Sequence, residues 1–220
     1  MAASRDGRSG GDGGPPPRAG NSPDGDAGTT WRVFARDLVT SVLAVLVVGA
    51  YLFAVSGVWP PLVAVESGSM NPNMQRNDLV FVMEEHRFAG PGAQPSTGVV
   101  TAAAGAETDY RMFGQPGDVI VYEPDGNNDT VPIIHRAMLW ADKGENWVAR
   151  ADESHLGSAT TCEAVEYCPA EQAGFITKGD NNRHYDQVRP SKLSRPVRPE
   201  WVIGTAEIRI PGLGWLRLRT

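Results

Sequence analysis

An uncharged apolar run constrains this chain more than any other feature of its sequence. The run covers residues 38–58 and contains no charged side chain. As an α-helix with a rise of about 1.5 Å per residue, it would span roughly 30 Å, the thickness of a hydrocarbon layer. Trp31 and Trp59 flank the run at positions suited to the two membrane interfaces. The sequence therefore predicts a transmembrane anchor, which with its flanks occupies residues 31–61.

A cleaved signal peptide and a buried core helix are the alternatives for this run. The apolar core of a signal peptide is usually about 7–15 residues long, and no small-x-small cleavage site follows this longer run. Pro60 and Pro61 are predicted to end the helix, because neither can donate a backbone hydrogen bond. The C-terminal segment 212–220 is too short to cross a membrane. We therefore expect one retained N-terminal anchor.

Arginine residues on one side of the run predict its orientation. Arg32 and Arg36 come just before it, whereas the first basic residue after it is Arg76. Basic residues favour the cytoplasmic side, so we expect a cytoplasmic N-terminus and an extracytoplasmic domain at the cell membrane. Residues 1–30 are rich in glycine and proline and have little to bury, which predicts a disordered cytoplasmic tail.

The part after the anchor has the pattern of a mainly β domain. Short bursts of β-branched and aromatic residues alternate with turn residues, as strands do in β-rich domains. The bursts lie at residues 79–82, 119–122, 133–134, 147–149, 174–177, 201–204 and 208–210. Residues 90–106 and 152–173 lack this pattern and are expected to be surface excursions. We predict one β-rich domain over residues 62–220.

The overall composition excludes some classes of function and leaves the cysteines open. The net charge is −6, with 26 acidic and 20 basic residues, which argues against a nucleic-acid-binding protein. Cys162 and Cys168 can close a small disulfide loop in an oxidising compartment. Free thiols and a metal site are the alternatives, although no zinc spacing includes these cysteines.

Three segments after the anchor contain residue types used in catalysis. Ser69 lies in a Ser-Gly-Ser-Met-Asn-Pro string, which by itself favours an ordinary turn. His135 ends an apolar burst, where it is either a core residue or a base facing a cleft. Asp180 and Asp186 belong to a polar stretch that fits an Asx turn and lacks the EF-hand pattern for calcium. The three other histidines lie in polar segments.

Taken together, these segments resemble the motif boxes of type I signal peptidases. The matching pieces are Ser-Gly-Ser-Met-x-Pro at residues 67–72, Ile-His-Arg at 134–136 and Gly-Asp-Asn-Asn-x-x-x-Asp at 179–186. The segments 113–121 and 209–214 also resemble parts of that family. The resemblance is to the archaeal and endoplasmic-reticulum branch, in which a histidine replaces the lysine base of the bacterial branch. It extends from the anchor to the C-terminus.

The resemblance implies a fold, an activity and a set of residue roles. It implies a signal-peptidase-type β domain that removes N-terminal signal peptides from secreted preproteins, without a cofactor or metal. Ser69 would be the nucleophile, His135 the general base and Asp186 the residue that orients the base. Ser67 and Asp180 would support them, Ser67 at the oxyanion. The implied partners are secretory preproteins, membrane lipid and the protein translocation machinery, and no nucleic acid.

Two other functions fit parts of the sequence. A LexA-like self-cleaving protein would need a catalytic lysine and a DNA-binding module, and neither the tail nor the anchor supplies them. A membrane-tethered, non-catalytic β domain that binds a surface partner would have no reactive serine. An acylating inhibitor that labels Ser69 would distinguish the enzyme from this binding domain.

Overall fold

The computed structural model describes residues 27–190 and 192–215. They fall into two compact units, residues 1–47 and residues 48–220. The predicted disordered tail lies almost entirely outside the described residues, as does the end of the C-terminal segment.

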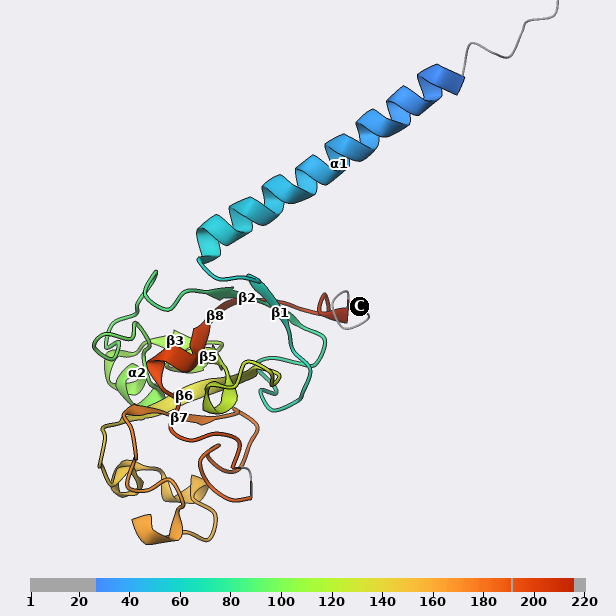
Figure 1. Ribbon diagram of the computed structural model, residues 1–220. Helices are drawn as coiled ribbons and strands as arrows, with labels where there is room; N and C mark the ends of the chain where they lie inside the picture. The colour runs from blue at the N-terminus through green and yellow to red at the C-terminus, as the bar shows by residue number, and fades with distance from the viewer. Residues whose placement is uncertain (1–26, 191, 216–220) are drawn as a thin grey trace, which may run out of the picture. The chain divides into compact units, whose positions relative to one another are not determined.

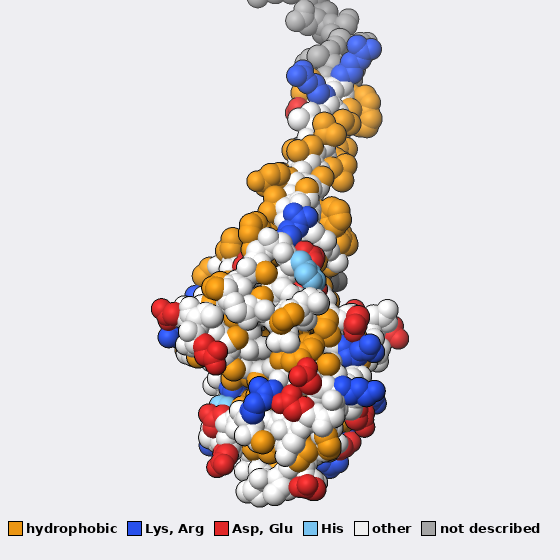
Figure 2. Space-filling model, turned by 90° about the vertical axis from the view of Figure 1, so that its left-hand side faces the viewer, with side chains coloured by type: hydrophobic (Ala, Val, Ile, Leu, Met, Phe, Trp, Pro, Cys, Tyr) orange, Lys and Arg blue, Asp and Glu red, His pale blue; other side chains and the backbone are white. Residues whose placement is uncertain are grey.

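Helix α1 (Ala27–Ser56) contains most of the apolar run that predicted the anchor. Its residues Thr30–Ser56 are long and apolar enough to cross a membrane, and no other described helix meets that criterion. Hydrophobic side chains cover the helix in Figure 2, with basic side chains near the end that adjoins the grey residues. The helix ends at Ser56, earlier than Pro60 and Pro61, the residues predicted to end it. It ends there because Gly57 adopts a φ of +79°, a conformation that favours glycine at helix C-termini.

The second unit is built on a six-stranded antiparallel sheet, in the order β1-β2-β8-β5-β6-β7 (Figure 1). The strands are β1 (Leu62–Ala64), β2 (Leu79–Met83), β5 (Val119–Tyr122), β6 (Ile133–Ala141), β7 (Gly174–Lys178) and β8 (Val202–Ile210). A small hairpin joins β3 (Arg111–Met112) to β4 (Gln115–Pro116), next to helix α2 (Ala102–Thr108). The C-terminal strand β8 lies between β2 and β5, so the sheet is complete only when the whole domain has folded. The prediction of a mainly β fold behind one apolar helix is confirmed.

Apolar residues at the predicted bursts form most of the core. Val80, Val82, Val119 and Val121 pack in one cluster with Met70 and Met74, the two methionines that follow Ser69. Ile120 and Tyr122 point to the other face and pack with Phe175 and Val197. Because side chains alternate between faces along a strand, β5 contributes to both clusters. The segment that carries Ser69 is therefore attached to the sheet through its buried methionines.

The connection from β6 to β7, residues 142–173, differs from the prediction. The burst at 147–149 is not a strand: it belongs to the 3₁₀-helix η3 (Trp147–Arg150). The stretch 152–173 is also more than a surface excursion, because Leu156, Val165 and Ala170 are buried with Trp147 in a cluster that includes residues of β6 and β7. In the other predicted excursion, Val99 and Val100 are buried and α2 begins at Ala102. Short apolar runs bounded by turn residues do not distinguish strands from 3₁₀-helices.

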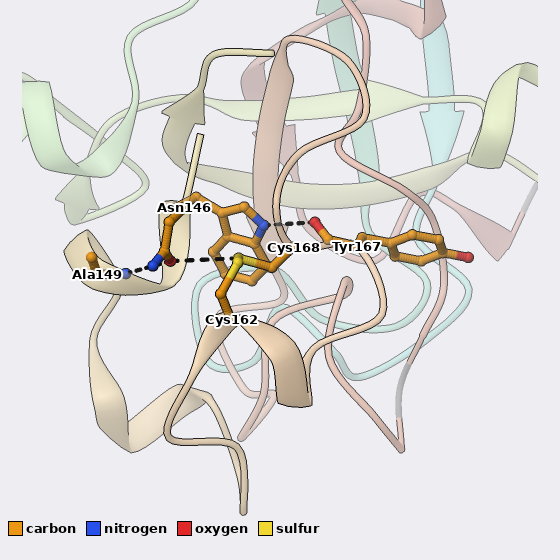
Figure 3. Close-up of a disulfide and its surroundings, with 6 residues drawn as sticks. Asn146, Ala149, Cys162, Tyr167 and Cys168 are labelled. Atoms are coloured by element: carbon orange, nitrogen blue, oxygen red, sulfur yellow. Dashed lines mark hydrogen bonds between the residues drawn. A yellow bond between two sulfur atoms is a disulfide. The ribbon is translucent and has the colours of Figure 1, made fainter. Parts of the chain in front are cut away.

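A disulfide between Cys162 and Cys168 closes a loop in this connection, as the disulfide alternative predicted. Figure 3 shows the bridge and its surroundings, with Asn146 and Tyr167 labelled. Trp147, which is buried in the same cluster as both cysteines, donates its indole N–H to the carbonyl oxygen of Tyr167 at 2.8 Å. The same ring packs edge-on against Tyr185, with centroids 6.1 Å apart. The connection between β6 and β7 therefore covers the residue that directly precedes Asp186.

Candidate functional site

A cleft of about 600 Å³ opens beside the segment that follows the anchor. Its polar lining includes Ser67, Ser69, His135 and Asn182, and the remaining lining is largely apolar. The apolar residues come from the start of the domain, from β5, β6 and β8 and from the loops beside them: Trp59, Pro60, Val63, Ala64, Val65, Met70, Val121, Val131, Pro132, Ile133, Ile134, Leu193 and Ile203. Predominantly apolar walls with a few converging polar groups are typical of ligand-binding sites.

Ser69 is held at the cleft by its backbone. Its carbonyl oxygen accepts a hydrogen bond from the backbone N–H of Asn181 at 2.7 Å. The Asn181 side chain donates to the carbonyl oxygen of Gly68 at 3.2 Å. Next along the chain, Met70 is buried in the core and its sulfur accepts from the backbone N–H of Asp180 at 3.4 Å. The turn at 179–182 therefore fixes the position of the Ser69 segment.

His135 and Asp186 form a buried pair at the other side of the site. The Nδ1 of His135 lies 2.6 Å from Oδ2 of Asp186, and both side chains are almost completely buried. Two hydroxyl groups donate to the same oxygen, Thr177 at 2.7 Å and Tyr122 at 3.0 Å. Because the carboxylate accepts from Nδ1–H, the neutral imidazole has its lone pair on Nε2. Asp186 thus fixes both the orientation and the tautomer of His135.

Asp180 has a different partner, Arg136. The guanidinium donates from Nε to Oδ1 at 2.8 Å and from Nη2 to Oδ2 at 2.7 Å. Asn73 donates to Oδ2 at 2.9 Å. Burial would raise the pKa of Asp180, but the Arg136 hydrogen bonds and charge, with Asn73, lower it below the ordinary value. The side chain of Asp180 is therefore committed to Arg136, and Asp186 is the aspartate that meets His135.

Gly179 separates Ser69 from His135. A Cβ at this position would lie 2.7 Å from the Ser69 carbonyl oxygen and 2.9 Å from His135 Nε2. The Ser69 hydroxyl itself pairs with the Ser67 hydroxyl at 3.0 Å. Within the described part of the chain, no hydrogen bond joins Ser69 Oγ to His135. The site thus brings the two residues to one cleft with Nε2 next to the Ser69 peptide, and the serine hydroxyl is turned toward Ser67.

The remaining sequence candidates lie elsewhere. His86 is largely exposed and pairs with Glu84 at 2.8 Å, a pairing that raises the pKa of the imidazole. Glu84, Glu85 and His86 are close enough to one another to bind a cation, but none of them lines the cleft. His155 binds the Arg183 carbonyl oxygen at 2.9 Å, and His184 packs beside Gly157. Among the described residues, His135 is the histidine that reaches the cleft.

Sequence reasoning missed Tyr122 and Thr177, which hold Asp186. Antiparallel pairing places Ile120 opposite His135 and Ala137 opposite Thr177. Directly paired residues share a face, and so do residues two apart on one strand. Tyr122, His135 and Thr177 therefore share one face of the sheet. The pairing of the strands was the missing information, since the bursts alone do not say which strands are neighbours.

The buried residue Lys178 was also missed. Its ammonium group donates to the carbonyl oxygens of Gly179 at 3.0 Å and Asn182 at 3.1 Å. Burial lowers its pKa from the ordinary value, against the attraction of Asp180 and Asp186. Both acceptors belong to the turn at 179–182, so Lys178 stabilises the turn that binds the Ser69 segment.

A serine at an apolar cleft with a histidine–aspartate pair has the groups that serine hydrolases use. A β domain of this kind, joined to a helix long enough to span a membrane, has the features of a membrane-anchored serine hydrolase. The comparison with curated proteins agrees with this class. The chain is 26% identical over 159 residues to the signal peptidase complex catalytic subunit SEC11 of Saccharomyces cerevisiae strain YJM789, and equally to those of strains RM11-1a and JAY291.

The aligned region covers 72% of this chain and 64% of each relative. The chain therefore spans less than two thirds of the length of these relatives. No family model matches it. Homology to SEC11 supports the resemblance to type I signal peptidases of the endoplasmic-reticulum branch. Together with the apolar N-terminal helix, it also supports a membrane-anchored protein.

Proposed function

We propose that this protein is a signal peptidase I, a membrane-bound serine endopeptidase that removes N-terminal signal peptides from secreted preproteins. The observation that carries the proposal is the His135–Asp186 pair, 2.6 Å apart, at the same cleft as Ser69. The similarity to SEC11 supports the same activity. In this proposal Ser69 is the nucleophile, His135 the general base and Asp186 the orienting carboxylate.

The reaction begins when the Ser69 side chain rotates from Ser67 toward Nε2 of His135. Such contacts often tighten only when substrate is bound. His135 accepts the hydroxyl proton as Oγ attacks the scissile carbonyl carbon, and Asp186 stabilises the imidazolium. His135 then protonates the leaving amine, and water hydrolyses the acyl-enzyme.

Ser67 has a second role in this scheme. Once Ser69 turns away, the Ser67 hydroxyl is free to donate a hydrogen bond at the mouth of the cleft, beside the Ser69 backbone N–H. These two donors would stabilise the oxyanion. Losing one such donor typically lowers the rate by about 10²–10³. Asp180 acts through Arg136 and the turn, as a supporting residue.

The cleft also offers a way to bind an extended peptide. Strand β1 pairs with β2 on one side and ends the six-stranded sheet. Its residues Val63 and Ala64 line the cleft. A substrate in extended conformation would lie along this outermost strand and place its side chains among apolar walls. This arrangement suits a peptide with apolar residues before the scissile bond.

We further propose that the N-terminus is cytoplasmic and the β domain extracytoplasmic at the cell membrane, as the arginine bias indicates. The domain begins directly after α1, so its cleft remains tethered to the bilayer that also carries its substrates. The proposed partners are secretory preproteins, membrane lipid and the translocation machinery. Residues 31–61 then act as the anchor and residues 62–220 as the peptidase domain.

A preprotein cleavage assay in lipid vesicles tests this function. Ser69→Ala and His135→Ala should each abolish processing while the protein still unfolds in one cooperative thermal transition. A lysine at position 135 should give poor activity, because the Asp186 carboxylate would favour its protonated form, which cannot accept the Ser69 proton. An acylating inhibitor should label Ser69 only when His135 is present. Normal processing by the Ser69→Ala variant would refute the proposal and favour the non-catalytic binding domain.

A further inference from the structure

Asn182 presents an unused carboxamide to the cleft. Its backbone is fixed, because its N–H donates to the Gly179 carbonyl oxygen at 2.8 Å and its own carbonyl oxygen accepts from Lys178. Its side chain lines the cleft and makes no hydrogen bond to the described part of the protein. The amide of the neighbouring Asn181, by contrast, binds the Gly68 carbonyl oxygen. Asn182 therefore has a donor and an acceptor available on a rigid turn.

The carboxamide lies beside the reactive nitrogen of His135. A Cβ on Gly179 would lie 2.8 Å from Asn182 Nδ2 and 2.9 Å from His135 Nε2. Both nitrogens are close to that one point, so they are less than about 6 Å apart. Two hydrogen bonds of about 2.8–3.0 Å placed end to end cover that distance. The spacing is therefore short enough for one oxygen or nitrogen atom of water or substrate to contact both groups.

During the reaction two such atoms lie next to Nε2 in turn: the nitrogen of the leaving amine and then the oxygen of the hydrolytic water. The imidazolium gives its proton to the leaving amine, which must lie within hydrogen-bond distance of Nε2. After that amine departs, the hydrolytic water approaches the acyl carbonyl from the same side and gives its proton to Nε2. Each of these atoms needs a second hydrogen-bond partner in a cleft whose walls are mostly apolar.

We propose that Asn182 is a further catalytic residue, which binds the hydrolytic water, and before it the leaving amine, opposite His135. This inference rests on the proposed function. In deacylation the water O–H bond breaks, its proton moves to Nε2, and a bond forms between the water oxygen and the acyl carbon. The ester bond to Ser69 then breaks, and Oγ takes the proton back from His135. Asn182 orients the attacking lone pair and exchanges no proton.

Asn182→Ala and the nearly isosteric Asn182→Leu test the proposal on the full-length chain in detergent, with a peptide ester substrate. An ester leaving group makes acylation fast, so that turnover reports deacylation. Active sites are counted with an acylating inhibitor, which removes any contribution from misfolded protein. We expect kcat per active site to fall by about 10²-fold, while mass spectrometry shows the acyl group accumulating on Ser69. Asn128→Ala is the matched control, since Asn128 is exposed and outside the cleft.

Each outcome decides the question. A kcat within twofold of the unmodified chain, a loss confined to KM, or a fall in kcat without acyl-Ser69 would overturn the role of Asn182. In each of these cases the proposed function still stands, provided that the unmodified chain cleaves the substrate and the Ser69→Ala variant does not. If the Ser69→Ala variant cleaves as well as the unmodified chain, the peptidase function itself fails. Two substitutions are used so that misfolding of one leaves the other to be measured.

Discussion

His135 and Arg136 are neighbours on strand β6, and their side chains point to opposite faces of the sheet. On one face His135 meets Asp186, and on the other Arg136 binds Asp180 through two hydrogen bonds. A single dipeptide thus assigns the two aspartates to two different tasks. One carboxylate orients the proposed base, and the other anchors the turn next to the nucleophile.

This division predicts different consequences for the two conservative substitutions. Asp186→Asn should lower kcat by about 10⁴, because an amide favours the wrong imidazole tautomer, with little loss of stability. Asp180→Asn should instead lower the free energy of unfolding by about 3 kcal/mol, because it leaves the buried Arg136 without its counter-charge. Chemical denaturation and single-turnover kinetics on both variants measure the two effects. Equal kinetic losses in the two variants would contradict the assignment.

At the scale of elements, Asp118 joins the start of β5 to two segments around α2. Its Oδ2 accepts from the backbone N–H of Val100 at 2.7 Å, and its Oδ1 accepts from the Tyr110 hydroxyl at 2.9 Å. Burial raises the pKa of this carboxyl to about 6, and Glu207 adds to the increase, while the two hydrogen bonds and Arg136 oppose it. The carboxyl therefore binds its proton more tightly in the folded protein than in the unfolded chain.

The raised pKa predicts how stability depends on pH. The contribution of Asp118 is fully present below its ordinary pKa of 3.8 and is lost as the pH rises through about 6. The loss is about 3 kcal/mol, since each pKa unit is worth about 1.4 kcal/mol. Asp118→Asn should remove this part of the pH dependence, because an amide can bind both partners without ionising.

Thermal unfolding between pH 4 and pH 7 tests this prediction. The quantity to compare at each pH is the difference in stability between the Asp118→Asn variant and the unmodified chain. Asp109→Asn is the control, because Asp109 is exposed and forms its ion pair with the exposed Arg111. It should leave the pH dependence unchanged. Parallel stability profiles for Asp118→Asn and the unmodified chain would show that Asp118 does not titrate in this range.

At the scale of the whole molecule, the chain combines an apolar helix with a β domain that begins directly after it. A tether to the membrane raises the effective concentration of the cleft toward membrane-embedded substrates without adding any contact. The proposed triad is built from residues of the second unit, so the chemistry itself does not depend on residues 1–47.

Removing residues 1–47 should therefore separate binding to the membrane from catalysis. In detergent, the shortened chain should cleave a soluble peptide with nearly the kcat/KM of the full chain. In vesicles, its processing of membrane-embedded preproteins should fall by about 10²-fold, because the tether is lost. An unrelated apolar helix in place of the anchor should restore processing. Loss of soluble-peptide cleavage would instead show that the first unit takes part in the site.

The sequence by itself determined the features that depend on neighbouring residues. A long uncharged apolar run predicts a membrane-spanning helix, and short bursts of β-branched and aromatic residues between turn residues predicted strands such as β2, β5 and β7. Ser69, His135 and the two aspartates stood out through local motifs and a family resemblance. Local pattern was insufficient at 147–149, where a short apolar burst formed a 3₁₀-helix in the connection between β6 and β7 and packed with residues of both strands.

Only the tertiary structure decided which of these residues meet. His135 and Asp186 are far apart in sequence, and the antiparallel pairing of β6 with β7 brings them together. The pairing of β5 with β6 brings Tyr122 to the same carboxylate. The β6–β7 pairing gives Asp180 to Arg136 and places Thr177 on Asp186. It also leaves the Asn182 carboxamide at the cleft beside His135. Partner choice depends on distances between strands and on which face each side chain occupies, and neither is contained in a local stretch of sequence.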